Sequence, residues 1–113
     1  MKAIKFALFL ILFLLTACEK IDDNAPDCIK YLIKHHQDKM WLCEKGASVN
    51  QYSFQGEFVY VFDPGTCGAD MQAPVYNETC ELLGNLGGII GNLIINGERF
   101  DQNAVFIKTI WTD

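Results

Sequence analysis

Five cysteines are the residues of this chain with the clearest chemical potential, and Cys18 stands apart from the other four. It directly follows Leu15-Thr16-Ala17 at the end of the apolar run 6–15, and Lys2 and Lys5 precede that run. A basic start, a short apolar core and small residues before a cleavage point are typical of a secretory signal. Ten apolar residues are too few to span a bilayer, which takes about 20. A cysteine in this place is where a lipoprotein receives diacylglycerol as a thioether, so we predict lipidation of Cys18.

This interpretation divides the chain into three parts. Residues 1–17 are the expected lipoprotein signal peptide, residues 18–27 the lipidated cysteine with a flexible acidic tether, and residues 28–113 a single small domain. Glu19 follows the cysteine, in place of the aspartate associated with retention at the inner membrane. We therefore expect a protein of the cell envelope that is anchored by lipid in the outer membrane, either facing the periplasm or exposed at the surface.

The charge of the mature chain excludes several partners. Removal of the signal takes away two lysines and leaves seven Lys and Arg residues against fourteen Asp and Glu, a net charge of −7. An acidic domain is a poor match for nucleic acid or for anionic lipid headgroups. The expected partners are thus the membrane, through the lipid on Cys18, and an unknown envelope protein or extracellular ligand.

The other four cysteines are expected to form disulfides, because an even number in a short exported chain is typical of an oxidising compartment. Three connectivities are possible, and the preference for short loops favours Cys28–Cys43 with Cys67–Cys80. No C-x-x-C spacing is present and no histidine lies near Cys67 or Cys80, which argues against zinc and against a thioredoxin-like role. We predict no metal site and no cofactor.

Periodicity predicts one helix followed by strands. Apolar residues recur at helical spacing within 26–37, and from residue 40 onward the period changes to that of strands. Gln55-Gly56 and Asn96-Gly97 are expected turns. The segment 84–92 is rich in glycine but lacks the Lys-Ser/Thr of a phosphate-binding loop, so we expect a tight, buried loop. The predicted strands cover 40–43, 51–54, 57–62, 74–76, 79–83 and 104–111.

The predicted fold class is therefore α+β: a short N-terminal helix packed on a small, mainly antiparallel sheet and stapled by disulfides. Within 57–62, aromatic residues alternate with valines, so both faces of that strand are apolar and we expect it to lie centrally in the sheet. Adjacent His35 and His36 point about 100° apart on a helix and do not suit one metal ion. The candidate binding residues are Asp70, Glu78, Gly87, Gly88 and Asn92.

A longer motif carries a family resemblance. The run CGADMQAPVYNETCELLGNLGGIIGNLIING begins at Cys67 and is followed by Asn103-Ala104 and Ile110-Trp111. In these residues the chain resembles a family of short bacterial lipoproteins that share a domain of unknown function. The resemblance extends from Cys28 to Trp111, and it implies no activity or ligand.

Three hypotheses for the function follow. The first is a non-catalytic binding or structural domain, and no catalytic residue is then assigned. The alternative is an inhibitor of a secreted hydrolase that presents the loop 67–80. A small enzyme is the third, with Asp70, His36 and either Glu78 or Glu81 as acid and base, although no spacing in the sequence requires those groups to converge.

Overall fold

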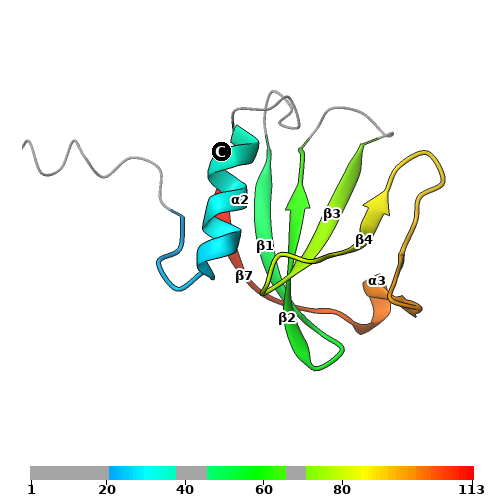
Figure 1. Ribbon diagram of the computed structural model, residues 1–113. Coiled ribbons are helices and arrows are strands. Elements are labelled where there is room, and N and C mark those ends of the chain that lie inside the picture. The colour runs from blue at the N-terminus through cyan, green and yellow to red at the C-terminus, as the bar shows by residue number, and fades with distance from the viewer. Residues whose placement is uncertain (1–20, 38–45, 66–70) are drawn as a thin grey trace, which may run out of the picture.

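A curved antiparallel sheet with a helix on one of its faces organises the computed structural model (Figure 1). The structure describes residues 21–37, 46–65 and 71–113. Cys18, Cys43, Cys67, Asp70 and the predicted strand 40–43 lie outside these residues. The described elements are α2 (Asp27–Gln37), β1 (Ser48–Phe54), β2 (Glu57–Asp63), β3 (Gln72–Asn77), β4 (Leu82–Gly87), β5 (Ile94–Ile95), β6 (Glu98–Arg99), α3 (Phe100–Asn103) and β7 (Val105–Thr112).

Among the described residues, five strands pair in the order β4-β3-β2-β1-β7, and β5 and β6 form a separate two-stranded ribbon. The hairpin of β1 and β2 turns at Gln55 and Gly56, whose φ angles of 53° and 79° are both positive. A two-residue turn of this kind matches the twist of the strands that it joins. The predicted helix, hairpin and α+β class are confirmed.

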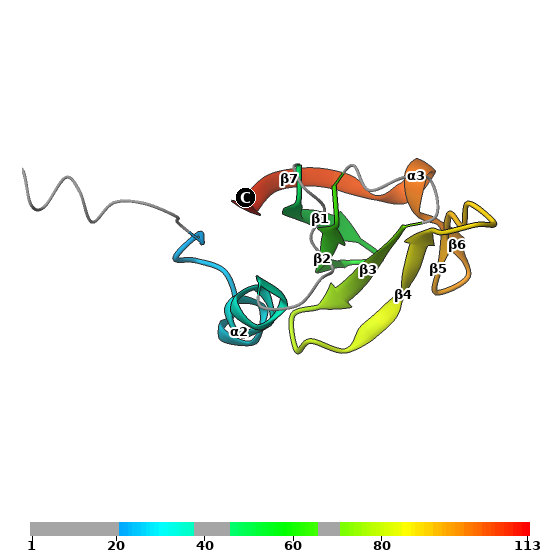
Figure 2. The ribbon, with the colours of Figure 1, turned by 90° about the horizontal axis from the view of Figure 1, so that it is seen from above.

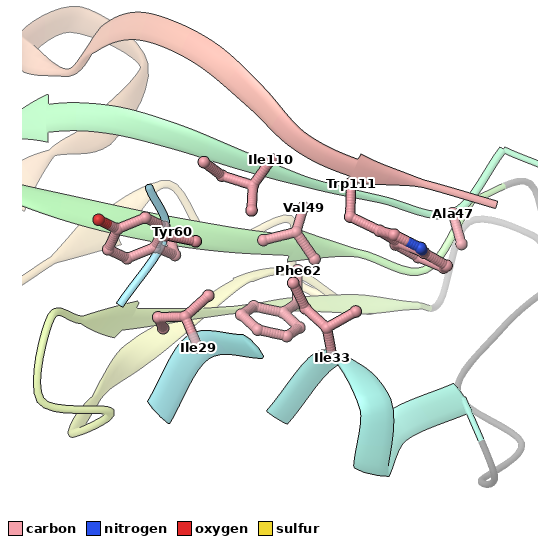
Figure 3. Packing of buried hydrophobic residues seen from close by; sticks show 9 residues of the cluster. Ile29, Ile33, Ala47, Val49, Tyr60, Phe62, Ile110 and Trp111 are labelled. Carbon is pink, nitrogen blue, oxygen red and sulfur yellow. The ribbon is translucent and has the colours of Figure 1, made fainter. Parts of the chain in front are cut away.

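The helix α2 covers one face of the sheet. Ile29 and Ile33 are four residues apart, so they share a helical face, and both are fully buried. Figure 3 shows them pointing toward Phe62 and Val49 of the sheet. Burial of each isoleucine contributes about 1.5–3 kcal/mol. The buried residues of this cluster are Ala25, Ile29, Ile33, Ala47, Val49, Tyr60, Phe62, Ile110 and Trp111.

A second cluster covers the opposite face. There the β5–β6 ribbon and α3 lie across the sheet from α2, as Figure 2 shows from above. Tyr60 and Phe62 of β2 pack toward the helix, and Val59 and Val61 pack the other way. The prediction that this strand is central is confirmed. The buried residues of the second cluster are Phe54, Val59, Val61, Val75, Ile95 and Phe100.

The segment before α2 is packed on the sheet. The backbone N–H of Asp22 donates to the carbonyl oxygen of Ile110 in β7 at 3.0 Å, Ala25 is buried, and Ile21 packs against the first cluster. The sequence predicts a flexible tether up to residue 27, but its described part, from Ile21 onward, is packed against the domain. Acidic residues dominate the composition of this segment, so the apolar contacts of Ile21 and Ala25 are not evident from the sequence.

The glycine-rich segment differs from its prediction. Gly84 and Gly87 belong to β4, which runs over 82–87 instead of 79–83, and only the turn 88–91 is a loop. The side chains of Ile89 and Ile90 at this turn are 86% and 88% exposed, so the expectation of a buried loop was wrong. The backbone hydrogen bonds of the turn form within the loop and to Met71, so burial is not required to satisfy them.

The disulfide in the described residues joins Cys28 of α2 to Cys80 in the β3–β4 turn. The preferred pairs Cys28–Cys43 and Cys67–Cys80 were wrong, since each would use a cysteine that is already bonded. The bond connects residues separated by 52 positions, with 6.0 Å between their Cα atoms. No helix in the described part of the chain is long and apolar enough to cross a membrane.

Candidate functional site

A groove lies on the helix side of the sheet, beside the start of α2. It consists of two adjoining hollows of about 600 and 420 Å³, which share Phe58 and Glu78. The register of β1 and β2 builds its floor, because Gln51 pairs with Tyr60 and Ser53 pairs with Phe58. The first hollow is lined by Ser53, Gly56, Glu57, Phe58, Asn77, Glu78, Thr79 and Glu81. The second is lined by Asn24, Pro26, Gln51, Phe58, Tyr60, Glu78, Ile107 and Lys108.

Two buried polar side chains form the base of the second hollow. Gln51 and Tyr60 are only 8% and 2% exposed. The Nε2 of Gln51 donates a hydrogen bond to the hydroxyl oxygen of Tyr60 at 3.1 Å. Burial raises the pKa of the Tyr60 hydroxyl, and the hydrogen bond from Gln51 opposes that shift. The pair therefore presents neutral hydrogen-bonding groups to the groove at physiological pH.

The β3–β4 turn forms one wall of the groove and is held by the side chain of Asn77. Its Oδ1 accepts hydrogen bonds from the backbone N–H groups of Thr79 and Glu81, at 3.0 and 2.9 Å. Cys80 adopts a positive φ of 63°, and its disulfide attaches the turn to α2. The rim residues Glu78 and Glu81 thus lie on a closed turn that is covalently attached to the helix.

Acidic side chains line one end of the groove, and the lysine at the other end is paired with a carboxylate. Glu57, Glu78 and Glu81 line the first hollow and are exposed. Lys108, which lines the second hollow, forms an ion pair with Asp22 at 2.6 Å. The hydrogen bond from Lys108 is the main cause that lowers the pKa of Asp22 below its ordinary value. Asp22 therefore balances the positive charge of Lys108, and the net charge of the groove is negative.

Four of the five predicted binding residues lie in the described part of the chain, and the structure does not bring these four together. Glu78 lines the groove, whereas Gly87, Gly88 and Asn92 lie at the other end of β4. There the backbone groups of Gly87 and Asn92 exchange two hydrogen bonds of 2.9 and 3.0 Å. The Nδ2 of Asn92 donates to the carbonyl oxygens of Asn85 and Ile94. These three residues therefore build the loop.

Of the acid–base residues of the enzyme hypothesis, Asp70 lies outside the described residues, and the others come from two separate elements, α2 and the β3–β4 turn. His36 lies eight residues after Cys28 on α2, which is about 12 Å along the helix axis. Cys28 is the residue that forms the disulfide to the turn that carries Glu78. His35 is exposed and stacks on Tyr31 with 5.2 Å between the ring centres. Within residues 21–37, 46–65 and 71–113, no cluster of three His, Cys, Asp or Glu side chains could hold a metal ion.

The inhibitor hypothesis has lost its structural premise. It presents the segment 67–80 as a loop closed by its own disulfide, but Cys80 is bonded to Cys28 on the helix. That bond attaches the end of the segment to the body of the domain.

Sequence reasoning missed the floor of the groove. The sequence predicts that 57–62 is a central strand with two apolar faces, and Tyr60 is indeed buried, but Phe58 is 43% exposed. The available signal was in β1, where Val49, Gln51 and Ser53 alternate toward the helix side and two of the three are polar. A glutamine on the inward face of a strand beside an apolar one indicates a specific polar contact.

The fold and the groove define a small α+β domain with a disulfide and an acidic groove. The family model for a domain of unknown function (DUF6970) matches residues 33–113, and the chain belongs to this family. Searches among curated proteins and among solved structures found no match.

Proposed function

We propose that this chain is a lipid-anchored protein of the cell envelope whose folded domain is a non-catalytic binding module. The observation that carries the binding role is the groove beside α2, with a buried polar pair at its base and apolar and acidic residues around it. A buried polar pair costs stability unless its remaining hydrogen bonds are made. A ligand or water in the groove would make them.

The anchoring role is supported by the sequence before the domain. Cys18 follows Leu15-Thr16-Ala17, and Ile21 already packs against the sheet. Three residue steps reach at most about 11 Å, so a lipid on Cys18 would hold the domain close to the membrane surface. Two or three acyl chains give stable attachment, since each buried methylene contributes about 0.8 kcal/mol.

Metabolic labelling with an alkyne-bearing palmitate tests the anchor. We expect label on the wild-type protein and on Cys43→Ser, and none on Cys18→Ser, because only the Cys18 thiol is the proposed acceptor. Equal labelling of Cys18→Ser and the wild type would contradict lipidation at this position.

Site-specific photocrosslinking in intact cells tests the groove. A benzophenone amino acid replaces Phe58 in one variant and Phe106 in the other, and these two phenylalanines are 43% and 53% exposed. Phe106 contacts Tyr52 on the opposite face of the sheet, which makes it a matched control. We expect adducts from position 58 in clear excess over position 106. Equal yields would contradict a binding role for the groove.

A further inference from the structure

We propose that the groove binds an extended peptide that carries a lysine or arginine side chain. This inference rests on the binding role proposed above and names the class of ligand. The peptide backbone meets Gln51 and Tyr60 at the base of the second hollow, and the basic side chain reaches the carboxylates that line the first hollow.

The buried pair has unused hydrogen-bonding capacity. Gln51 uses its Nε2 as the donor, and Tyr60 uses its oxygen as the acceptor. In the described part of the chain, the Oε1 of Gln51 meets no donor and the Tyr60 hydroxyl proton meets no acceptor. Both side chains line the second hollow, so the pair offers one acceptor and one donor to an occupant.

One residue of an extended peptide satisfies both groups. In a strand, the N–H and C=O of the same residue point to the same side, which is how hydrogen-bonded pairs in antiparallel sheets exchange two bonds. Such a residue can donate to Gln51 and accept from Tyr60. A polyamine presents donors alone and leaves the Tyr60 proton without a partner.

The walls suit the aliphatic part of a long basic side chain. Phe58, shared by both hollows, is 43% exposed, and Ile107 and Pro26 also line the second hollow. The methylene groups of lysine or arginine bury apolar area against such residues while the charged end stays accessible. A cation placed over the ring of Phe58 is attracted further by the electron-rich face of the ring.

The rim supplies the charge that selects a cation. Three glutamates, Glu57, Glu78 and Glu81, line the first hollow, and the lysine that lines the second hollow, Lys108, is paired with Asp22. The mature chain has a net charge of −7, which raises the local concentration of basic ligands and speeds their association.

Fluorescence anisotropy with the purified full-length protein in a neutral detergent tests the proposal. The probe is a fluorescein-labelled tetralysine amide, and spermine is the competitor without a peptide backbone. Glu78→Gln removes one carboxylate of the groove, and Glu98→Gln removes one on β6, outside both hollows. We expect Glu78→Gln to weaken tetralysine binding about fivefold and Glu98→Gln less than about twofold.

The floor is tested by Gln51→Met and by the milder Tyr60→Phe, with thermal unfolding recorded first to establish that each variant folds. We expect both variants to weaken tetralysine binding about threefold or more and to leave the dissociation constant of spermine unchanged. Equal losses of tetralysine affinity in Glu78→Gln and Glu98→Gln would show that net charge alone attracts the peptide. That result would overturn the site. Equal losses for tetralysine and spermine in Gln51→Met would overturn the peptide contact.

A wild-type protein that binds no tetralysine would overturn this inference alone. Photocrosslinking from position 58 would then still report occupancy of the groove by another ligand, so the two proposals fail separately.

Discussion

Asp22 connects the N-terminal segment to β7 through its side chain as well as its backbone. The side chain forms the ion pair with Lys108, and its Oδ1 accepts a hydrogen bond from the backbone N–H of Asn24 at 2.9 Å. Both contacts favour the charged carboxylate and lower the pKa of Asp22, the contact with Lys108 most. A carboxyl whose pKa is lower in the folded state stabilises the fold above its unfolded pKa, and this contribution disappears as pH falls through the folded pKa.

We predict that Asp22→Asn lowers the thermal unfolding midpoint at pH 7 and that the difference from wild type shrinks below about pH 4. The effect is small, because the ion pair is solvent-accessible. Thermal unfolding followed by circular dichroism across this range measures it. In a Lys108→Met background the same substitution should cost less. An unchanged cost there would show that Lys108 is not the main cause.

Tyr60, which is buried, and Tyr76, which is partly buried, titrate at the other end of the pH scale. Burial raises the pKa of Tyr60 and of Tyr76. A raised folded pKa gives stability that is present below the unfolded pKa and is lost as pH rises through the folded pKa, so alkali above about pH 10 destabilises the fold. We predict that part of the tyrosinate absorbance in the ultraviolet rises only at a pH above the ordinary pKa of tyrosine. Tyr60→Phe and Tyr76→Phe should each remove one such step from the titration curve. A titration curve unchanged by either substitution would contradict their burial.

At the scale of single residues, one of the binding candidates named from the sequence lies at the groove. Glu78 was identified as a binding candidate and does line the groove. Gln51 was missed, because its role depends on pairing with Tyr60 across two strands, and that register is set by tertiary packing as well as by the turn.

At the scale of elements, the turn after β4 requires glycine at a particular position. Gly87 has a φ of +79°, and a Cβ there would lie 3.1 Å from the backbone oxygen of Met71. Gly91 in the same turn has a φ of +62°, with nothing within 4 Å of an added Cβ. The first position therefore combines backbone strain with a steric contact, and the second has the strain alone.

We predict that Gly91→Ala destabilises the domain by about 1 kcal/mol, the usual cost of the left-handed conformation, and that Gly87→Ala costs more. Chemical denaturation with urea measures both free energies of unfolding. A smaller cost for Gly87→Ala than for Gly91→Ala would mean that the backbone oxygen of Met71 moves away without penalty.

The sequence predicted best those elements that are bounded by residues with a strong preference for turns. The turns at Gln55-Gly56 and Asn96-Gly97 occur where predicted, with positive φ at all four residues. The start of β4 was misplaced, because Thr79 and Glu81 are hydrogen-bonded to the side chain of Asn77 and are thereby drawn into the turn. A side-chain network of this kind competes with strand pairing and leaves little trace in apolar periodicity.

At the scale of the whole molecule, the disulfide shows why connectivity could not be predicted. Preference for short loops rests on the entropy of closure, which changes by only about 0.6 kcal/mol for each doubling of loop length. The packing of Ile29 and Ile33 against the sheet outweighs that difference. It places the start of α2 beside the β3–β4 turn, where Cys28 meets Cys80 across 52 positions.

This bond should therefore be a main support of the domain. A loop of this length stabilises by about 4 kcal/mol in the chain-entropy model, and removal of a native disulfide from a small domain costs about 2–5 kcal/mol. We predict such a loss in the free energy of unfolding of Cys28→Ala, measured with guanidinium chloride. Because one bond is removed in each case, Cys80→Ala and the double variant should lose about as much as Cys28→Ala. Additive losses in the double variant, or a proteolytic map that joins Cys28 to another cysteine, would contradict the attachment of the groove wall to the helix.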